Sequence, residues 1–279
     1  MLDLRNRLDR SEKLLVLGVV ILLLGACLVE FYIQESLVAY ALAGVVGFML
    51  VLYIYDRRRM PEEMHDRLKN ESKQLESLAS LHVALIDDSP PLPDTRGWAA
   101  SPDLLKLTAE LIHEEQPSLI VEAGSGVSTV VYGRILKGKS GKVCSLEHEL
   151  TYHEKSSRLI ETHGLTETCR VHHTPLVSHM INEEDWMWYD LDDVHLDRPI
   201  DLLFIDGPPE RIQTLSRYPA VPLLFEHLSE EAVIVLDDGG REEEEEIVRK
   251  WTQEYPSLEA EYKSLEKGAF VIRRGSESR

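Results

Sequence analysis

Three aspartates stand at the ends of two predicted strands, and their side chains could do acid–base or metal chemistry. Asp206 ends the predicted strand 201–206, and Asp237 and Asp238 end the predicted strand 232–237. In an open parallel sheet, ligands bind beyond the carboxyl ends of the strands. If these two strands are neighbours, the three carboxylates converge on one site and raise one another's pKa.

A divalent cation is one remedy for such crowding, because Mg²⁺ takes oxygen ligands and keeps positions open for water. Asp206, Asp237 and Asp238 are therefore candidate metal ligands, and Asp206 and Asp238 are also candidate catalytic residues. The alternative is that Asp206 caps its own turn and that Asp237 or Asp238 caps the following helix. The sequence leaves both interpretations open.

A turn rich in small residues, EAGSGVST at 122–129, joins a predicted strand to a predicted helix. Gly124 and Gly126 let the backbone lie against a ligand, and the helix N-terminus offers free N–H groups. Glu147 ends the next strand, 23 residues after Gly124, where an acid can bind a ribose diol. The candidate cofactor-binding residues are Glu122, Gly124, Ser125, Gly126, Ser128, Glu147, His148 and Asp206.

Two cofactors use this geometry, NAD and S-adenosylmethionine (SAM). The NAD fingerprint requires a third glycine, and Thr129 stands at that position. SAM has no pyrophosphate to accommodate. The turn therefore favours SAM over NAD.

Strand-like and helical segments alternate from Trp98 onward. This alternation predicts an α/β domain at 98–279 with a doubly wound, Rossmann-like, mostly parallel seven-stranded sheet, whose antiparallel edge comes from a terminal hairpin. The predicted strands are 118–122, 142–147, 169–173, 201–206, 232–237, 259–265 and 269–273. The predicted helices are 102–115, 127–136, a segment that ends at about 163, and 242–251.

Two long apolar runs, Leu14 to Ile33 and Leu37 to Tyr55, precede that domain. Each is about as long as the roughly 20 residues that a helix needs to cross a bilayer. Basic residues flank the pair, including the run 57–59, whereas the turn between them has none, which predicts cytoplasmic termini. The sequence thus predicts a two-helix transmembrane hairpin at 1–56 in the inner (cytoplasmic) membrane, with both termini and the α/β domain on the cytoplasmic side.

A helical stalk and linker are predicted at 57–97. Apolar residues recur at helical spacing over 61–85, and a Pro- and Asp-rich break follows at 87–97. We expect the stalk to pack on the α/β domain. Self-association through residues 1–85, giving a homo-oligomer, is the alternative.

The composition is strongly acidic, with 30 Lys and Arg against 49 Asp and Glu and a net charge of −19. Binding to nucleic-acid phosphates needs clustered cations, so no nucleic-acid partner is expected. The 3 cysteines form no CxxC pair. Their number and spacing argue against a disulfide framework and fit a reducing compartment.

Several segments resemble class I SAM-dependent methyltransferases, in particular a bacterial O-methyltransferase-like subgroup with a DGPP segment. The resemblance covers roughly residues 98–274. The matching segments are the turn 122–129, the acid Glu147, FIDGPP at 204–209 and VLDD at 235–238, together with WYD at 188–190 and RYPAVPLL at 217–224.

The resemblance implies roles for some of these residues. Glu122, Gly124 and Gly126 would line the methionine end of SAM. Glu147 would bind the ribose, and residues 173–177 would lie near the adenine.

The strand-end acids are also similar to those of magnesium-dependent O-methyltransferases. That resemblance implies a metal that binds the acceptor hydroxyls and lowers their pKa. The sugar-modifying enzymes of that type carry a further acid two residues after the first aspartate, acting as base, and this chain has Pro208 there. The departure puts the identity of the base, and the metal itself, in question.

We therefore expect a membrane-anchored SAM-dependent methyltransferase that acts on an oxygen of a membrane-associated acceptor, either a lipid, a glycan or a protein. One alternative is a non-catalytic scaffold that keeps the nucleotide pocket without turnover. Another is an NAD-linked enzyme, which the missing third glycine disfavours.

Overall fold

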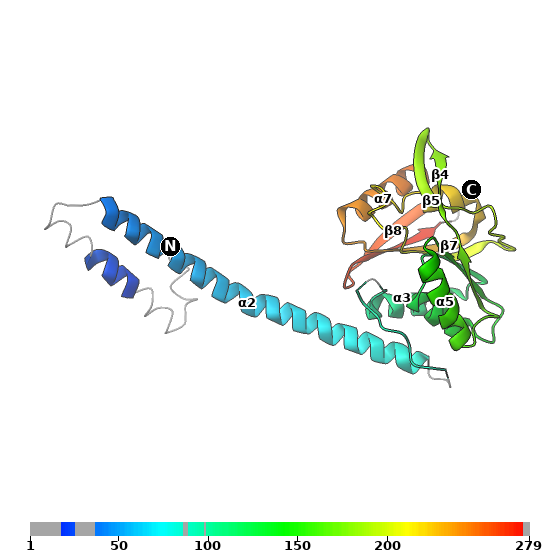
Figure 1. Cartoon of the computed structure of the whole chain (residues 1–279), viewed down its shortest axis with the longest axis horizontal. Helices are drawn as coiled ribbons and strands as arrows, with labels where there is room; N and C mark the ends of the chain where they lie inside the picture. Colours follow the sequence, from blue (N-terminus) through cyan, green and yellow to red (C-terminus); the bar gives the residue numbers. More distant parts are fainter. Residues whose placement is uncertain (1–17, 26–36, 86–88, 98, 276–279) are drawn as a thin grey trace. The chain divides into compact units, whose positions relative to one another are not determined.

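The computed structural model describes residues 18–25, 37–85, 89–97 and 99–275 (Figure 1). The chain divides into two units between Lys69 and Asn70. The second unit contains the sheet domain, which carries all the candidate site residues.

The domain is built on a seven-stranded sheet with the order β3-β2-β1-β6-β7-β9-β8. Strands β3, β2, β1, β6 and β7 pair in parallel, and β9 pairs antiparallel with both β7 and β8. The predicted mostly parallel sheet with an antiparallel edge is therefore confirmed. The strands are β1 (Leu119–Ala123), β2 (Lys142–Glu147), β3 (Cys169–His173), β6 (Ile200–Ile205), β7 (Leu228–Asp237), β8 (Leu258–Lys263) and β9 (Ala269–Arg274).

Helices cover both faces of the sheet, which explains why its central strands are mostly apolar on both faces. Successive residues of a strand point to opposite faces, so Leu202 and Phe204 of β6 join one buried cluster while Leu203 and Ile205 join the other. The helices of the domain are α3 (Pro102–Glu115), α4 (Val127–Leu136), α5 (Leu150–Thr162), α6 (Ala220–Leu224), the short 3-10 helix η2 (Phe225–His227) and α7 (Glu242–Glu254).

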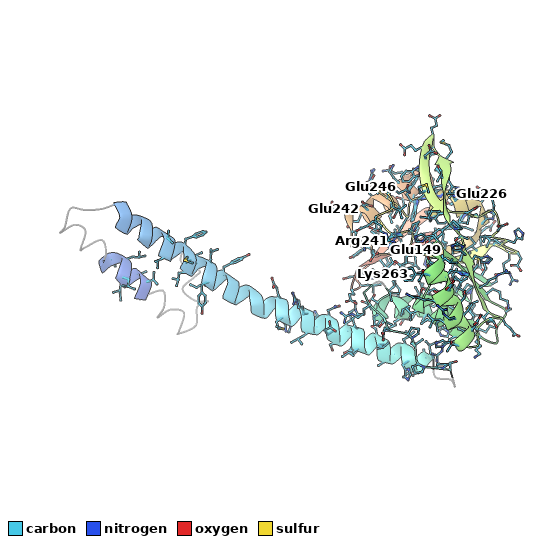
Figure 2. All side chains as sticks on the ribbon, in the orientation of Figure 1. Glu149, Glu226, Arg241, Glu242, Glu246 and Lys263 are labelled. Carbon is cyan, nitrogen blue, oxygen red and sulfur yellow. The ribbon has the colours of Figure 1, made fainter. Side chains whose placement is uncertain are left out.

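Helix α7 shows how an acidic segment fits this fold. Its first turn is a run of glutamates, whose charge suits the positive end of a helix dipole. Glu242 faces solvent (Figure 2), whereas Glu244 is buried. The buried carboxylate of Glu244 must therefore find a partner inside the domain.

A second, two-stranded sheet lies between β3 and β6 in the sequence. It is an antiparallel hairpin of β4 (Leu176–Ile181) and β5 (Glu184–Tyr189). The turn residues Asn182 and Glu183 both have positive φ angles, 51° and 66°, as a tight two-residue hairpin turn requires. The sequence patterns do not predict this hairpin.

Helix α2 (Leu37–Ala84) is one continuous element of 48 residues. Its part from Asn70 onward belongs to the second unit, where Leu81 and Leu85 are buried in the domain core. The ammonium group of Lys73 lies 3.2 Å from the carboxylate of Asp103 at the start of α3. The expected packing of this helical segment on the α/β domain is thus observed for residues 70–85.

The predicted membrane anchoring requires correction. Within the residues that the structure describes, none of the helices is long and apolar enough to cross a membrane. Of the first run, residues 18–25 are described as helix, and the rest lies outside the described residues. The second run lies within α2, which continues through a charged segment to Ala84. The predicted two-pass arrangement and inner-membrane localisation are therefore wrong.

Candidate functional site

The sheet order brings the candidate residues to one edge. Strands β2, β1, β6 and β7 are consecutive neighbours and run in the same direction. Their carboxyl ends carry Glu147, the turn 122–129, Asp206 and the pair 237–238. Ligands of doubly wound sheets bind at this edge.

The glycine turn between β1 and α4 is shaped by two backbone conformations that glycine tolerates. Gly124 has φ of 114° and Gly126 has φ of 154°. The N–H group of Gly126 donates to the hydroxyl of Thr129 at 3.0 Å, which fixes the entry to α4. A Cβ atom at Gly126 would meet nothing within 4 Å, so the backbone of the turn is open to a ligand.

Glu122 lies beneath this turn and is only 1% exposed. Its carboxylate accepts hydrogen bonds from the hydroxyls of Ser128, Thr129 and Ser145. Burial raises the pKa of Glu122, and these three hydroxyl donors oppose that shift. In this structure the carboxylate is engaged inside the protein, where it ties the turn to β1 and β2.

Glu147, at the end of β2, faces the turn from the other side. It accepts a hydrogen bond from the hydroxyl of Ser125 at 3.0 Å and one from the N–H of Glu149 at 2.9 Å. The Nδ1 atom of His148 lies 3.3 Å from its Oε1 atom. Burial would raise the pKa of Glu147, but His148, the Glu149 N–H and the Ser125 hydroxyl together lower it. Glu147 is thus a carboxylate at neutral pH, as binding to ribose hydroxyls requires.

The segment after β3 lies beside Glu147, as the resemblance implied for an adenine site. The N–H of Thr174 donates to the carbonyl oxygen of Glu147 at 2.8 Å. The Thr174 side chain is buried, and its hydroxyl has no hydrogen-bond partner within the described part of the chain. An open glycine turn, an ionised acid and an unpaired buried hydroxyl together fit a nucleoside.

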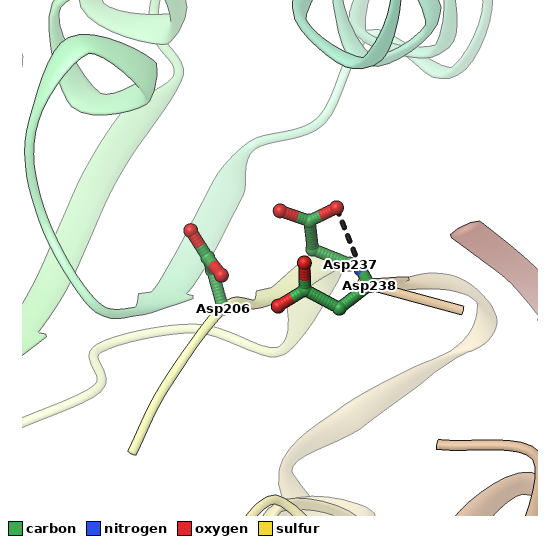
Figure 3. A group of neighbouring side chains, drawn as sticks. All are labelled: Asp206, Asp237 and Asp238. Atoms are coloured by element: carbon green, nitrogen blue, oxygen red, sulfur yellow. Dashed lines mark hydrogen bonds between the residues drawn. The ribbon is translucent and has the colours of Figure 1, made fainter. Parts of the chain in front are cut away.

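The three aspartates lie close together on the other side of the turn (Figure 3). One carboxylate oxygen from each can be chosen so that all lie within 4.8 Å of one another. The N–H of Asp238 donates to Oδ1 of Asp237 at 2.7 Å, and Asp238 adopts a positive φ of 56°. A non-glycine residue in this conformation stores strain, which is commonest at functional sites.

Their surroundings raise the pKa values of two of these acids. Burial and the neighbouring Asp237 raise the pKa of Asp206 well above its ordinary value, although Arg217 opposes the shift. Burial and Asp238 likewise raise the pKa of Asp237. The Asp206 side chain keeps 24% of its surface exposed, so it remains accessible to a ligand.

Replacing Asp237 by asparagine is expected to stabilise the protein at high pH. In the folded state Asp237 holds its proton more tightly than in the unfolded chain, so folding stability falls as pH rises from about 4 through the folded pKa. The Asp237→Asn variant loses that penalty. Its melting temperature should exceed that of the wild type at pH 8. At pH 5 the difference between the two melting temperatures should be smaller. An equal or lower melting temperature at both pH values would contradict the assignment.

Arg217 is a site residue that the sequence analysis quoted only as part of a segment, without a role. It lies in the loop between β6 and α6, and its side chain is 4% exposed. Its Nη2 atom lies 3.1 Å from Oδ1 of Asp206 and 2.7 Å from Oδ2 of Asp238. The sequence signal that could have indicated a role for Arg217 is a lone arginine before an apolar segment.

A cavity of about 710 Å³ opens beside Asp206 and Asp238. Its lining includes cationic and anionic side chains in equal number, two apolar side chains and backbone from the terminal hairpin. The lining residues are Gly97, Asp206, Pro209, Glu210, Arg211, Arg217, Asp238, Gly240, Arg241, Tyr262, Leu265, Glu266, Lys267 and Gly268. Asp206 is therefore shared between the glycine turn and a separate polar cavity.

Comparisons with known proteins agree with this geometry. Residues 121–239 match a family model described as a methyltransferase domain. The SAH-bound (S-adenosylhomocysteine-bound) methyltransferase of Podospora anserina is 15% identical, with 77% of this chain and 97% of that chain covered at a TM-score of 0.52. An O-methyltransferase from Bacillus cereus in complex with SAH is 19% identical, with 73% and 90% covered at a TM-score of 0.49. No curated protein matches this sequence.

The likeness to the Podospora structure shows a shared fold. The family match extends over the glycine turn, Glu147, Asp206 and the aspartate pair at the end of β7. The family match identifies residues 121–239 as a methyltransferase domain, and the enzyme is a SAM-dependent methyltransferase.

Proposed function

We propose that this enzyme transfers a methyl group from SAM to a hydroxyl oxygen of an acceptor held in the cavity beside Asp206. The observation that carries the proposal is the position of Asp206 between two sites. Its N–H donates to the carbonyl oxygen of Ala123 at 3.0 Å, next to the glycine turn, and its side chain lines the cavity. A group at this junction can contact both a cofactor and an acceptor.

The cofactor half of the site consists of the turn, Glu147 and Thr174. The carboxylate of Glu147 can accept hydrogen bonds from ribose hydroxyls, and the open backbone at Gly126 leaves room for the methionine part of the ligand. When bound, SAM supplies an electrophilic methyl group whose bond to sulfur breaks as the bond to the acceptor oxygen forms.

We assign the role of base in the acceptor half to the carboxylate form of Asp206. Asp206 with a raised pKa can take the proton from an acceptor hydroxyl, because a stronger base removes a proton from a weak acid more readily. The cavity would hold that hydroxyl close to the transferable methyl group, and this positioning supplies much of the rate enhancement. A lining with charges of both signs favours a polar acceptor.

Isothermal titration calorimetry on the full chain tests the cofactor directly. We expect SAM and SAH each to bind at one site and NAD⁺ to give no heat of binding, with Mg²⁺ or with a chelator in the buffer. Binding of NAD⁺ but not of SAH would assign the turn to dinucleotide chemistry. Binding of SAM and SAH without any methyl transfer to an acceptor would favour the scaffold alternative.

A further inference from the structure

The guanidinium group of Arg217 lies inside the carboxylate cluster. Besides its contacts with Asp206 and Asp238, Nη1 donates to the carbonyl oxygen of Asp237 at 2.9 Å and lies 3.3 Å from Oε1 of Glu244. Three carboxylates and one backbone carbonyl oxygen thus surround one buried guanidinium. We propose that Arg217 is a built-in cation that occupies the place of a divalent metal, and that this cluster is closed to Mg²⁺.

The distances argue against a metal bound alongside Arg217. An ion that bridges Asp206 and Asp238 through the oxygens facing Arg217 would need to approach each to about 2.1 Å. Nη2 already lies 3.1 Å and 2.7 Å from those two oxygens. The ion would therefore stand next to a positively charged nitrogen, and two cations at such a distance repel strongly in a buried site.

Asp238 has a cation at each of its oxygens. Its Oδ2 atom contacts both Arg217 and, at 3.2 Å, Nη2 of Arg241. Its Oδ1 atom lies 3.9 Å from Nζ of Lys267. Both oxygens of Asp238 therefore face positive charge, and Oδ2 already accepts a hydrogen bond from Arg217. Because Arg217, Arg241 and Lys267 already bring positive charge to these carboxylates, the residues present do not fit the magnesium site that the resemblance implied for Asp206, Asp237 and Asp238.

Asp206 differs from Asp238 in this respect. Only its Oδ1 atom contacts Arg217, and among the described residues no hydrogen bond is made by Oδ2. Because the side chain lines the cavity and is partly exposed, Oδ2 can meet an acceptor hydroxyl. The role of Arg217 is then that of a positioning residue, which holds Asp206 and balances the charge of its neighbours.

A cluster closed to metals changes how the acceptor is held. This step rests on the proposed function. A metal-dependent enzyme can hold its acceptor through two oxygens on the ion. Here a single hydroxyl on Asp206 is sufficient, so the acceptor needs neither a catechol nor a vicinal diol.

Titration of the full chain with Mn²⁺, followed by the electron paramagnetic resonance signal of the free ion, tests the closed cluster without any methyl transfer. Asp206→Asn serves as the control, because this acidic protein also binds cations at its surface, and only binding that this substitution removes belongs to the cluster. We expect wild type and Asp206→Asn to bind the same amount of Mn²⁺. Arg217→Gln should gain a site that binds Mn²⁺ at least about tenfold more tightly than the surface sites of the wild type do, since the substitution removes the competing charge. Arg217→Lys keeps the charge and should gain none.

Wild-type binding of Mn²⁺ that Asp206→Asn abolishes would overturn the inference, and so would an Arg217→Gln variant that folds but gains no site. Circular dichroism and SAH titration report whether that variant folds. If it does not fold, the Mn²⁺ binding of the wild type and of Asp206→Asn is sufficient to decide whether the cluster is closed. A wild type that binds neither Mn²⁺ at the cluster nor SAM would refute the proposed function and leave the closed cluster standing.

Discussion

Replacing Glu147 by alanine is expected to weaken the binding of SAM and SAH by at least roughly 100-fold, because a hydrogen bond to a charged group contributes about 1.5–3 kcal/mol and a ribose offers two hydroxyls. The lowered pKa of Glu147 keeps it ionised at neutral pH, so the full effect applies there. Isothermal titration calorimetry at pH 7.5 measures the dissociation constants of both variant and wild type.

Glu149→Ala is the matched control for this substitution. Glu149 also lies after β2 and is acidic, but its side chain is 37% exposed and pairs with Arg211. Its contribution to the Glu147 site comes from the backbone N–H, which the substitution keeps. We expect its SAH affinity to stay within about threefold of wild type, the margin expected of an exposed pair. An equal loss in both variants would point to a general charge effect and would remove the ribose role from Glu147.

Replacing Asp206 by asparagine is expected to abolish methyl transfer while leaving SAH binding largely unchanged. Asparagine has a similar shape but cannot take a proton, and loss of a general base typically lowers the rate by about 100- to 10,000-fold. Label counted in products, after incubation of the enzyme with methyl-labelled SAM and a heat-treated metabolite extract, measures the transfer. Calorimetry with SAH measures binding in parallel.

Asp193→Asn provides the matched control, since Asp193 is an exposed aspartate in the loop between β5 and β6. It should transfer label at the wild-type rate. Full activity of Asp206→Asn would assign the proton transfer to another group. Loss of SAH binding together with activity would indicate that Asp206 supports the cofactor rather than the acceptor.

The sheet and its edge could be predicted because local patterns determine them. Each central strand is a short apolar run that ends in an acid or a glycine turn, and parallel topology places such ends together. Asp206 and Asp237 therefore lie together as expected, although their strands are separated in the sequence by a long loop and α6.

Arg217 could not be assigned a role from the sequence. It lies in a loop outside the predicted strands, and only the tertiary fold brings its guanidinium among acids from three segments. Charge crowding among the aspartates was foreseen, and Mg²⁺ was considered as its remedy. An arginine from the same chain supplies a positive charge there, and sequence spacing does not reveal such a contact.

The β4–β5 hairpin was missed for a different reason. Its turn is Asn182-Glu183, without the glycine that marks most two-residue hairpin turns, so Glu183 has to adopt a positive φ. The membrane prediction is wrong because none of the described helices is long and apolar enough to cross a bilayer. Helix α2 runs on through charged residues to Ala84, where its end packs on the domain core.

The most direct test of the central claim is a crystal structure of the full chain with SAH bound. We expect the ribose hydroxyls within hydrogen-bond distance of the Glu147 carboxylate, the adenine beside Thr174, and the sulfur facing Asp206 and the cavity. SAH bound elsewhere, for instance in the cavity between Asp238 and Tyr262 with Glu147 unengaged, would contradict both the cofactor site and the role of Asp206.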